Sequence, residues 1–276
     1  MTQSPIAATE YDTFRRYLED ACGIVLGENK HYLVTSRLKR VTEEFSFPSL
    51  SEMMSTLVKG NNSQLREKVI DAMTTNETMW FRDVYPFEIL RKELIPELAK
   101  KKAPIKIWSA ASSTGQEAYS ISMTTSEFQQ ANPGVLSSNV EIVGTDISQT
   151  VVNQAKLGHY DELSVVRGLS PERRDKFFSK KDDKWAINAD IARRTRFTEL
   201  NLLNNYSLLG KFDIIFCRNV LIYFSTEMKK DILERMAAIL KPGGTLILGG
   251  SESPTGYTKK FAMVRYPDGV VYRLHD

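Results

Sequence analysis

The sequence predicts an α/β fold: a doubly wound, mostly parallel sheet, preceded by a helical domain and closed by an antiparallel C-terminal hairpin. Three observations carry this prediction. Residues 10–75 show helical periodicity throughout, and from about residue 104 short apolar segments alternate with helical ones. Near the C-terminus, two strand-like segments flank Asp268-Gly269, a dipeptide that is typical of a hairpin turn.

The composition is that of an ordinary globular protein. Of the 276 residues, 42% are hydrophobic and 26% charged, and no apolar run approaches the length of a membrane span. The N-terminus lacks the basic start and apolar core of a secretion signal. With Cys22 and Cys217 as the only cysteines, a disulfide framework or thiolate metal cluster is not expected. We therefore expect a cytoplasmic monomer that holds no metal and does not insert into a membrane. The net charge of +3 is too small to indicate nucleic-acid binding.

Residues 1–75 are predicted to form the helical domain. Phe14 and Leu18 recur at helical spacing, as do later apolar residues. Ser49 and Glu52 have the spacing of a capping box, in which each side chain accepts a backbone hydrogen bond from the other residue. No strand pattern occurs in this part of the sequence.

One segment of the helical domain, "HYLVTSRLKR" (31–40), is rich in basic residues. Arg37, Lys39 and Arg40 lie within a single helical turn. Such a run is usually a solvated helix face, and the alternative is a docking surface for an acidic partner.

Four apolar segments predict the parallel strands of the sheet. They are "IKIWSA" (105–110), "VEIVGTD" (140–146), the start of "FDIIFCRNVLIYF" (212–224) and the end of "KPGGTLILGG" (241–250). Ser148 and Ser225 are expected to cap the helices that follow the second and third of these segments.

The segment 158–200 is too long for a plain crossover between strands. It contains a short helix after Ser170-Pro171 and the strand-like stretches "DKWAIN" and "RTRFTEL". We therefore predict an inserted β-subdomain at about 158–200. The predicted domains are residues 1–75 (helical), residues 76–103 (a linker and a helix that covers the cofactor) and residues 104–276 (the sheet with its insertion).

The loop within "IWSAASSTGQEAYS" (107–120) resembles a nucleotide-binding turn but is poor in glycine. A pyrophosphate needs several glycines so that the backbone approaches it closely, and here only Gly115 is present. Glu117 stands at the start of the following helix, where a carboxylate would repel phosphate and attract a cation. Stabilisation of the helix dipole is the ordinary explanation for an acid at this position.

Asp146 ends the second predicted strand. Ligands of open α/β sheets bind beyond the carboxyl ends of the strands, which predicts a crevice formed by residues 109–117, 146–148 and 217–223. An acid at this strand end can hold the two hydroxyls of a ribose, although it can also serve as a helix cap. Together with Glu117, it favours a phosphate-free, positively charged nucleoside such as S-adenosylmethionine.

Several longer motifs resemble those of the chemotaxis receptor glutamate O-methyltransferase family, CheR. They are "TTNETMWFRD" (74–83), "IWSAASSTGQEAYSISM" (107–123), "GTDIS" (144–148), "FDIIFCRNVLIYF" (212–224) and "LKPGGTLILGGSES" (240–253). The chain departs from the family's usual residues at Gln116, Ala118 and Met79-Trp80. The resemblance covers nearly the whole chain and implies a fold of the S-adenosylmethionine-dependent methyltransferase type.

The resemblance also implies an activity: a methyl group passes from S-adenosylmethionine to receptor glutamate side chains, leaving S-adenosylhomocysteine. Arg82 and Tyr223 are the candidate catalytic residues. Arg82 would pair with the methionyl carboxylate or the incoming glutamate, or form an interdomain ion pair, and Tyr223 would orient the substrate or only pack. The expected cofactor contacts are Asn76, Thr78, Arg82, Glu117, Asp146 (ribose), Asn201 and Leu202 (adenine), Arg218 and Asn219.

The expected partner is the cytoplasmic helical region of chemoreceptors, docked on Arg37, Lys39 and Arg40. A glutamate carboxylate is already ionised at neutral pH, so the reaction needs no general base. The scattered histidines agree with this. In some family members the inserted subdomain grips a peptide tethered to the receptor. The short, glycine-free "FFSKKDDKWAIN" predicts no strong binding of that kind here.

Three other functions compete with this interpretation. An RNA methyltransferase would show interleaved aromatic and basic residues near the basic helix, and none are visible. A nicotinamide dehydrogenase would carry the motif G-x-G-x-x-G, which is missing. A non-catalytic sensor or scaffold that binds S-adenosylmethionine stays open, because methyl transfer to a carboxylate needs no distinctive catalytic group.

Overall fold

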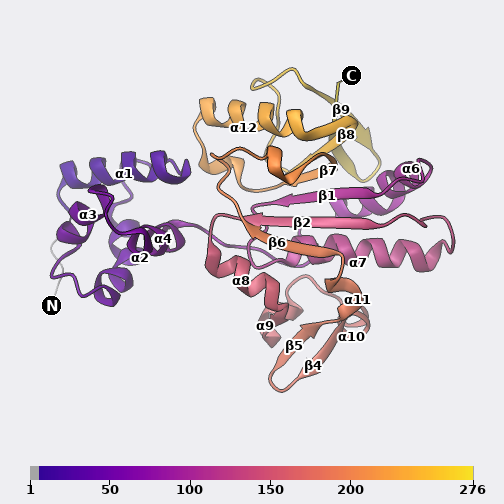
Figure 1. The fold of residues 1–276 in the computed structure, drawn as a ribbon, viewed down its shortest axis with the longest axis horizontal. Helices are drawn as coiled ribbons and strands as arrows, with labels where there is room; N and C mark the ends of the chain where they lie inside the picture. Colours follow the sequence, from indigo (N-terminus) through magenta and orange to yellow (C-terminus); the bar gives the residue numbers. More distant parts are fainter. Residues whose placement is uncertain (1–5, 276) are drawn as a thin grey trace.

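The computed structural model describes residues 6–275. A helical domain lies beside a larger domain built on a central sheet, and a small second sheet projects from the larger domain (Figure 1). No helix within residues 6–275 is long and apolar enough to cross a membrane.

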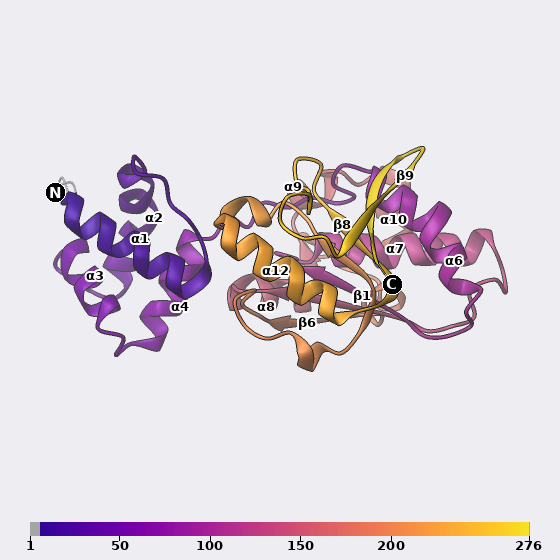
Figure 2. The same ribbon diagram turned by 90° about the horizontal axis from the view of Figure 1, so that it is seen from above.

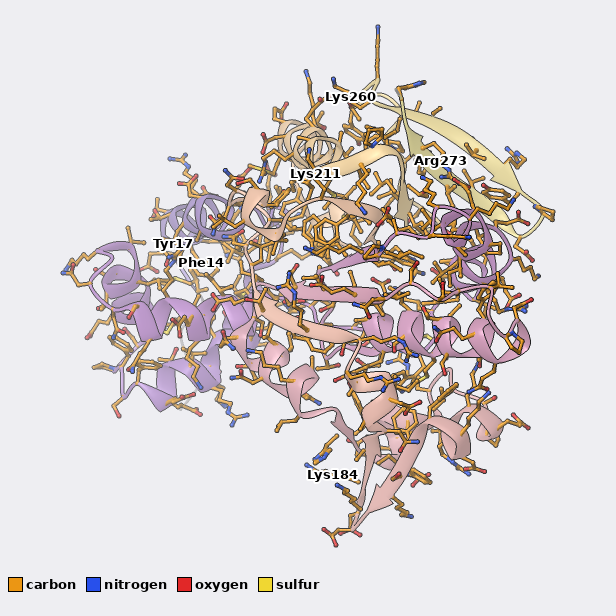
Figure 3. All side chains as sticks on the ribbon, turned by 45° about the vertical axis from the view of Figure 1, so that its right-hand side comes forward. Phe14, Tyr17, Lys184, Lys211, Lys260 and Arg273 are labelled. Atoms are coloured by element: carbon orange, nitrogen blue, oxygen red, sulfur yellow. The ribbon has the colours of Figure 1, made fainter. Side chains whose placement is uncertain are left out.

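Four helices form the N-terminal domain, as the periodicity predicts. They are α1 (Ala8–Cys22), α2 (His31–Glu44), α3 (Leu50–Val58) and α4 (Ser63–Met73). Phe14 and Leu18 are buried in their common core, which is separate from the two cores of the sheet domain. Figure 3 shows Phe14 and Tyr17 within this domain. Ser49 caps α3 by accepting a hydrogen bond from the backbone N–H of Glu52, which is one half of the expected capping box; among the described residues the reciprocal bond to the Glu52 side chain is not formed.

The central sheet has seven strands in the order β6-β2-β1-β7-β8-β10-β9. The first five are parallel and the last two pair antiparallel, so the expected hairpin closes one edge. The strands are β1 (Ile105–Ala110), β2 (Val140–Asp146), β6 (Thr195–Glu199), β7 (Phe212–Cys217), β8 (Leu240–Leu248), β9 (Phe261–Tyr266) and β10 (Gly269–Leu274).

Helices cover both faces of this sheet. The continuous helix α5-η1-α6 (Tyr85–Ile89, Leu90–Leu94, Ile95–Ala99), α7 (Gln116–Ala131) and α8 (Gln149–Leu157) pack in one core. The opposite core contains α12 (Thr226–Ile239) and the short helix η2 (Ser207–Leu209). Ser148 caps α8 and Ser225 caps α12, as predicted. The helix expected to cover the cofactor packs against the sheet instead, because its apolar residues belong to the first core.

The inserted subdomain is a three-stranded sheet in the order β3-β5-β4. Its strands are β3 (His159–Tyr160), β4 (Phe178–Lys181) and β5 (Lys184–Ile187), and it carries α9 (Glu162–Val166), α10 (Pro171–Phe177) and α11 (Ala189–Ala192). Lys184 lies at its tip, far from the main sheet (Figure 3).

The predicted bounds of the insertion need one correction. The stretch "RTRFTEL" contains β6, which pairs in parallel with β2 and so belongs to the main sheet. An apolar alternation indicates a strand but does not say which sheet that strand joins, and here Phe197 is buried in the first core of the main sheet.

The two domains meet where α1 ends. The amide of Asn201, after β6, donates a hydrogen bond to the carbonyl of Ala21 (2.9 Å), and Val25 N–H donates to the carbonyl of Tyr223 (2.9 Å). Between them, Gly23 has φ +78°, and a Cβ there would lie 2.6 Å from the ring of Phe224. Seen from above, the two domains lie side by side along the long axis (Figure 2). The end of α1 therefore rests on two loops that follow strands of the sheet.

Candidate cofactor and active site

A pocket lies at the carboxyl ends of the parallel strands, at the seam between the two domains. Segments after β1, β2, β6 and β7 form one side, and the end of α1 and the linker after α4 form the other. Eight residues that were predicted from the sequence line this pocket: Asn76, Arg82, Asp146, Asn201, Leu202, Arg218, Asn219 and Tyr223. Thr78 and Glu117 do not belong to the lining.

Asp146 lies at the tip of β2 and is nearly fully buried. Its carboxylate accepts hydrogen bonds from the backbone N–H groups of Ser113 (2.9 Å) and Ser148 (3.1 Å). Burial raises the pKa of Asp146, whereas these backbone donors act in the opposite direction. The carboxylate is thus held in a fixed orientation at the pocket wall, where it can accept hydrogen bonds from a diol.

The loop after β1 is closed on itself. The N–H of Ser112 donates to the carbonyl of Thr145, that of Ser113 to Asp146, and that of Gly115 to the carbonyl of Ser112. Ala111, Ser113 and Gly115 all have positive φ. Because these N–H groups have internal partners, they are not available for a phosphate, which agrees with the glycine-poor sequence.

Glu117 differs from its prediction. Its two oxygens accept hydrogen bonds from Ser109 (2.7 Å) and from the guanidinium of Arg218 (2.9 Å). The negative charge expected to attract a cation is therefore compensated by Arg218, whose side chain is only 2% exposed. Sequence reasoning missed this pair because the two residues come from different motifs.

Of the two arginines that line the pocket, Arg82 makes fewer hydrogen bonds to the rest of the protein than Arg218 does. Its guanidinium donates one long hydrogen bond, 3.3 Å, to the carbonyl of Glu77, and it forms no ion pair within residues 6–275. The interdomain ion pair considered from the sequence is therefore not formed. Tyr223 also lines the pocket, and its hydroxyl makes no hydrogen bond to another described residue.

Part of the pocket lining is apolar. Ile24 after α1, Leu202 after β6 and Phe224 after η3 (Leu221–Tyr223) all belong to the lining. Asn201 is held by its bond to Ala21 and accepts a hydrogen bond from the N–H of Leu203 (3.0 Å). These apolar side chains offer a purine base a surface to pack against.

Glu252 is a positioning residue that sequence reasoning missed. It follows β8, and one of its oxygens accepts from the N–H groups of Asn219 (2.7 Å) and Gly249 (2.9 Å). Asn219 has φ +57°, so the tip of β7 depends on this acceptor to hold an uncommon backbone conformation. A Cβ at Gly249 would lie 2.7 Å from the same carboxylate, which explains the glycine in "GGSES".

The two cysteines are buried thiols and lack the features of activated nucleophiles. Cys22 lines the pocket, but burial raises the pKa of its thiol to about 11. Burial also raises the pKa of Cys217, which is fully buried at the end of β7. Both thiols stay protonated at neutral pH, and the thiolate is the reactive form.

The three basic residues of α2 are not equivalent. Arg37 donates hydrogen bonds to the carbonyls of Met73 (2.6 Å) and Thr74 (3.2 Å) and to the hydroxyl of Thr75 (3.0 Å). It therefore ends α4 and fixes the linker that lines the pocket, whereas Lys39 and Arg40 are exposed. An Arg37 variant would therefore disturb the pocket, whereas the sequence predicted Arg37 only as part of the docking surface.

The described residues fit a phosphate-free nucleoside. A buried carboxylate, several apolar side chains and a guanidinium without an ion pair line the pocket, and the loop after β1 offers no anion site. No cluster of three or more His, Cys, Asp or Glu side chains in residues 6–275 could hold a metal ion. Fold and pocket together define the class of α/β methyltransferases that use S-adenosylmethionine.

Comparison with known proteins then gives the family. Residues 9–74 match the "CheR methyltransferase, all-alpha domain" and residues 76–270 the "CheR methyltransferase, SAM binding domain". The chain belongs to the CheR methyltransferase family, and its cofactor is S-adenosylmethionine. The resemblance inferred from the motifs is confirmed.

Curated relatives match along almost their whole length. A "Chemotaxis protein methyltransferase" of Vibrio anguillarum is 54% identical over 275 residues, which is 99% of this chain and 100% of the relative. "Chemotaxis protein methyltransferase 1" of Pseudomonas aeruginosa is 49% identical, covering 97% and 98% of the two chains. The protein of the same general name from Salmonella typhimurium is 33% identical, covering 91% and 86%.

Proposed function

We propose that this protein methylates glutamate side chains on the cytoplasmic helical region of chemoreceptors. The observation that carries the proposal is Arg82: a guanidinium without an ion pair, in a cofactor pocket whose thiol is protonated and whose lining contains no histidine. Such a pocket suits an acceptor that is already an anion and needs no general base. The names of the curated relatives place them in chemotaxis and support the same substrate class.

The residues of the pocket would act mainly by alignment. When bound, S-adenosylmethionine supplies the methyl group on a sulfonium and leaves as S-adenosylhomocysteine. Asp146 would hold the ribose hydroxyls, and Asn201 with Leu202 would hold the base. Arg82 and the hydroxyl of Tyr223 would orient a carboxylate beside the reacting carbon, which is the contribution of proximity and orientation.

Lys39 and Arg40 are proposed to attract the acidic receptor. Both are exposed on α2, one turn from the Arg37 contacts that fix the pocket's linker. Their effect would be on encounter with the substrate, because exposed charges act at long range and are screened by salt.

The experiment is transfer of labelled methyl groups to receptor-containing membranes, with mild alkali to release them as methanol, the mark of a methyl ester. Wild-type protein should transfer label, and Arg82→Ala should lose about 100-fold or more in rate. K39E/R40E should raise the KM for receptor and leave the affinity for S-adenosylhomocysteine unchanged. K259E/K260E is the matched control, since both lysines are exposed and Lys260 lies away from the helical domain (Figure 3).

Two outcomes would contradict the proposal. Label found in RNA instead of alkali-labile protein would identify a nucleic-acid methyltransferase. Tight cofactor binding with no transfer to any receptor of the host would identify a non-catalytic sensor or scaffold.

Independence from a tethered receptor peptide is part of the proposal. The strands β4 and β5 of the inserted sheet are joined by the two residues Asp182-Asp183 alone. This short hairpin offers little surface beyond its own strands. Calorimetry with an aromatic receptor-tail peptide should therefore detect no micromolar binding.

A further inference from the structure

The turn that carries Arg82 is strained. Phe81, Asp83 and Val84 have φ of +48°, +66° and +55°, and none of them is glycine. At Val84, φ +55° and ψ −53° combine with a hydrogen bond from Tyr85 N–H to the carbonyl of Asp83, which is a γ-turn of the rare, strained hand. A β-branched residue in such a conformation is a genuine outlier.

Contacts from other elements hold this turn in place. The guanidinium of Arg218 donates to the carbonyl of Arg82 (2.8 Å) and to the carboxylate of Asp83 (2.6 Å). The N–H of Phe81 donates to the hydroxyl of Ser120 on α7 (3.1 Å). Strain of this kind persists only where the surroundings over-determine the backbone.

The side chain of Val84 is poorly buried in the fold. It is 59% exposed, so it contributes little burial to offset its backbone strain. Glycine would adopt the same backbone without the steric cost. Folding by itself therefore disfavours valine at this position, which points to a contact outside the chain.

Two more exposed apolar side chains belong to segments that line the pocket. Ile222, 52% exposed, stands between buried Leu221 and pocket-lining Tyr223 in the short helix η3 (Leu221–Tyr223). Val25, 43% exposed, comes from the helical domain, and its N–H binds the carbonyl of Tyr223. Val84 itself lies two residues after Arg82. We call Val25, Val84 and Ile222 the apolar rim.

We propose that the apolar rim binds the receptor helix on either side of the methyl-accepting glutamate. The inference rests on the proposed function and adds the chemistry of the partner: an acidic helix with apolar side chains adjacent to the modified residue. Charge on α2 would attract such a helix, the pocket would take its carboxylate, and the rim would remove its neighbouring apolar surface from water. The rim takes residues from both domains, so a bound receptor helix would contact both sides of the seam.

Val84→Gly tests the rim without harming the fold. Because glycine relieves the strain, the melting temperature should stay the same or rise. Loss of the side chain should raise the KM for receptor about fivefold, with kcat and the affinity for S-adenosylhomocysteine unchanged. Val135→Gly is the matched control: Val135 is 52% exposed and lies in the turn between α7 and β2, at the other end of the sheet. It should leave the KM for receptor unchanged.

Ile222→Ser provides an independent second variant. Its matched control is Leu208→Ser, since Leu208 is 98% exposed and is likewise the central residue of a three-residue helix, η2. Ile222→Ser should raise the KM for receptor and Leu208→Ser should not. The inference would be overturned if Val84→Gly and Ile222→Ser both had the wild-type KM for receptor. It would also be overturned if the controls changed this KM as much as the rim variants did.

A binding measurement separates this inference from the proposed function. The affinity of each protein, saturated with S-adenosylhomocysteine, is measured for a purified cytoplasmic fragment of a host chemoreceptor. If wild-type protein binds the fragment but transfers no methyl group, the proposed reaction fails and the rim is still tested by this affinity. The rim predicts weaker binding by Val84→Gly and Ile222→Ser than by their two controls, and equal binding would overturn it.

Discussion

The two ends of the seven-stranded sheet each contain a carboxylate paired with a cation, yet the structure around them differs. At the amino end, Asp213 accepts hydrogen bonds from the N–H of Lys106 (2.8 Å) and from the ammonium of Lys241 (2.7 Å), whose side chain is 38% exposed. At the carboxyl end, Glu117 pairs with Arg218, whose side chain is almost completely buried. The two carboxylates are similarly shielded, so the difference lies in the cations: water reaches the ammonium of Lys241 but hardly reaches the guanidinium of Arg218.

Strain and unpaired polar atoms gather at the carboxyl end. Ala111, Ser113 and Asn219 have positive φ there, in addition to the turn at Val84. Within residues 6–275, five buried side-chain polar atoms lack a partner, and four of them belong to this end: those of Ser112, Arg218, Asn219 and Glu252. The comparison teaches that the carboxyl end is arranged to hold ligand-binding groups at some expense to stability, as is common at functional sites.

Removing the buried guanidinium of Arg218 should have the largest effect on stability. Arg218→Met leaves Glu117, whose side chain is only 13% exposed, without a counter-charge and releases the turn at Asp83, so we expect a loss of about 3–5 kcal/mol in the free energy of unfolding. Lys241→Met should cost less than about 1 kcal/mol, because that pair is partly solvated. Urea unfolding of both variants checks the difference, and equal losses would mean that the two ends are energetically alike.

Alanine substitutions at two glycines compare the seam between the domains with the amino end of the sheet. Gly23 and Gly134 have φ of +78° and +80°, so alanine at either position pays a similar backbone cost of about 1–2 kcal/mol. A Cβ at Gly134 meets nothing within 4 Å, whereas at Gly23 it meets Phe224. Gly23→Ala should therefore cost about 1–3 kcal/mol more in unfolding experiments.

The same variant should weaken S-adenosylhomocysteine binding, measured by calorimetry, because Cys22 and Ile24 line the pocket on either side of Gly23. Gly134→Ala should bind as wild type does. Wild-type affinity in Gly23→Ala would show that α1 is not part of the cofactor site.

The smallest expected effect is that of removing Glu252, the hydrogen-bond acceptor that holds the tip of β7. Glu252→Ala removes the partner of the Asn219 and Gly249 N–H groups and should raise the KM for S-adenosylmethionine about tenfold, the equivalent of about 1.4 kcal/mol. Glu252→Gln keeps an oxygen acceptor and should recover most of the loss. Glu141→Ala, at an exposed ion pair with Arg196, is the control and should change neither KM nor stability measurably. A Glu252→Gln variant as poor as Glu252→Ala would argue for a role of the charge itself.

Much of the site could be predicted because its residues lie at the ends of predicted strands. Asp146 ends β2 and Arg218 follows β7, and parallel strands bring their carboxyl ends to one edge. Glu252 and the Val84 turn could not be predicted in this way. No local pattern marks an acceptor that stabilises the backbone of another loop, or a valine held at positive φ by a distant arginine.

The sequence by itself determined the main helices and strands, the caps at Ser148 and Ser225, and the family, because periodicity, capping and motif spacing are properties of short segments. Only the tertiary structure decided that Arg218 compensates Glu117, that Arg37 fixes the linker instead of facing solvent, and that β6 joins the main sheet. The physical reason is that a charge or a strand takes its partner from whatever the fold brings beside it. Glu117 and Arg218 are 101 residues apart in the chain, and no pattern along the chain records a contact of that range.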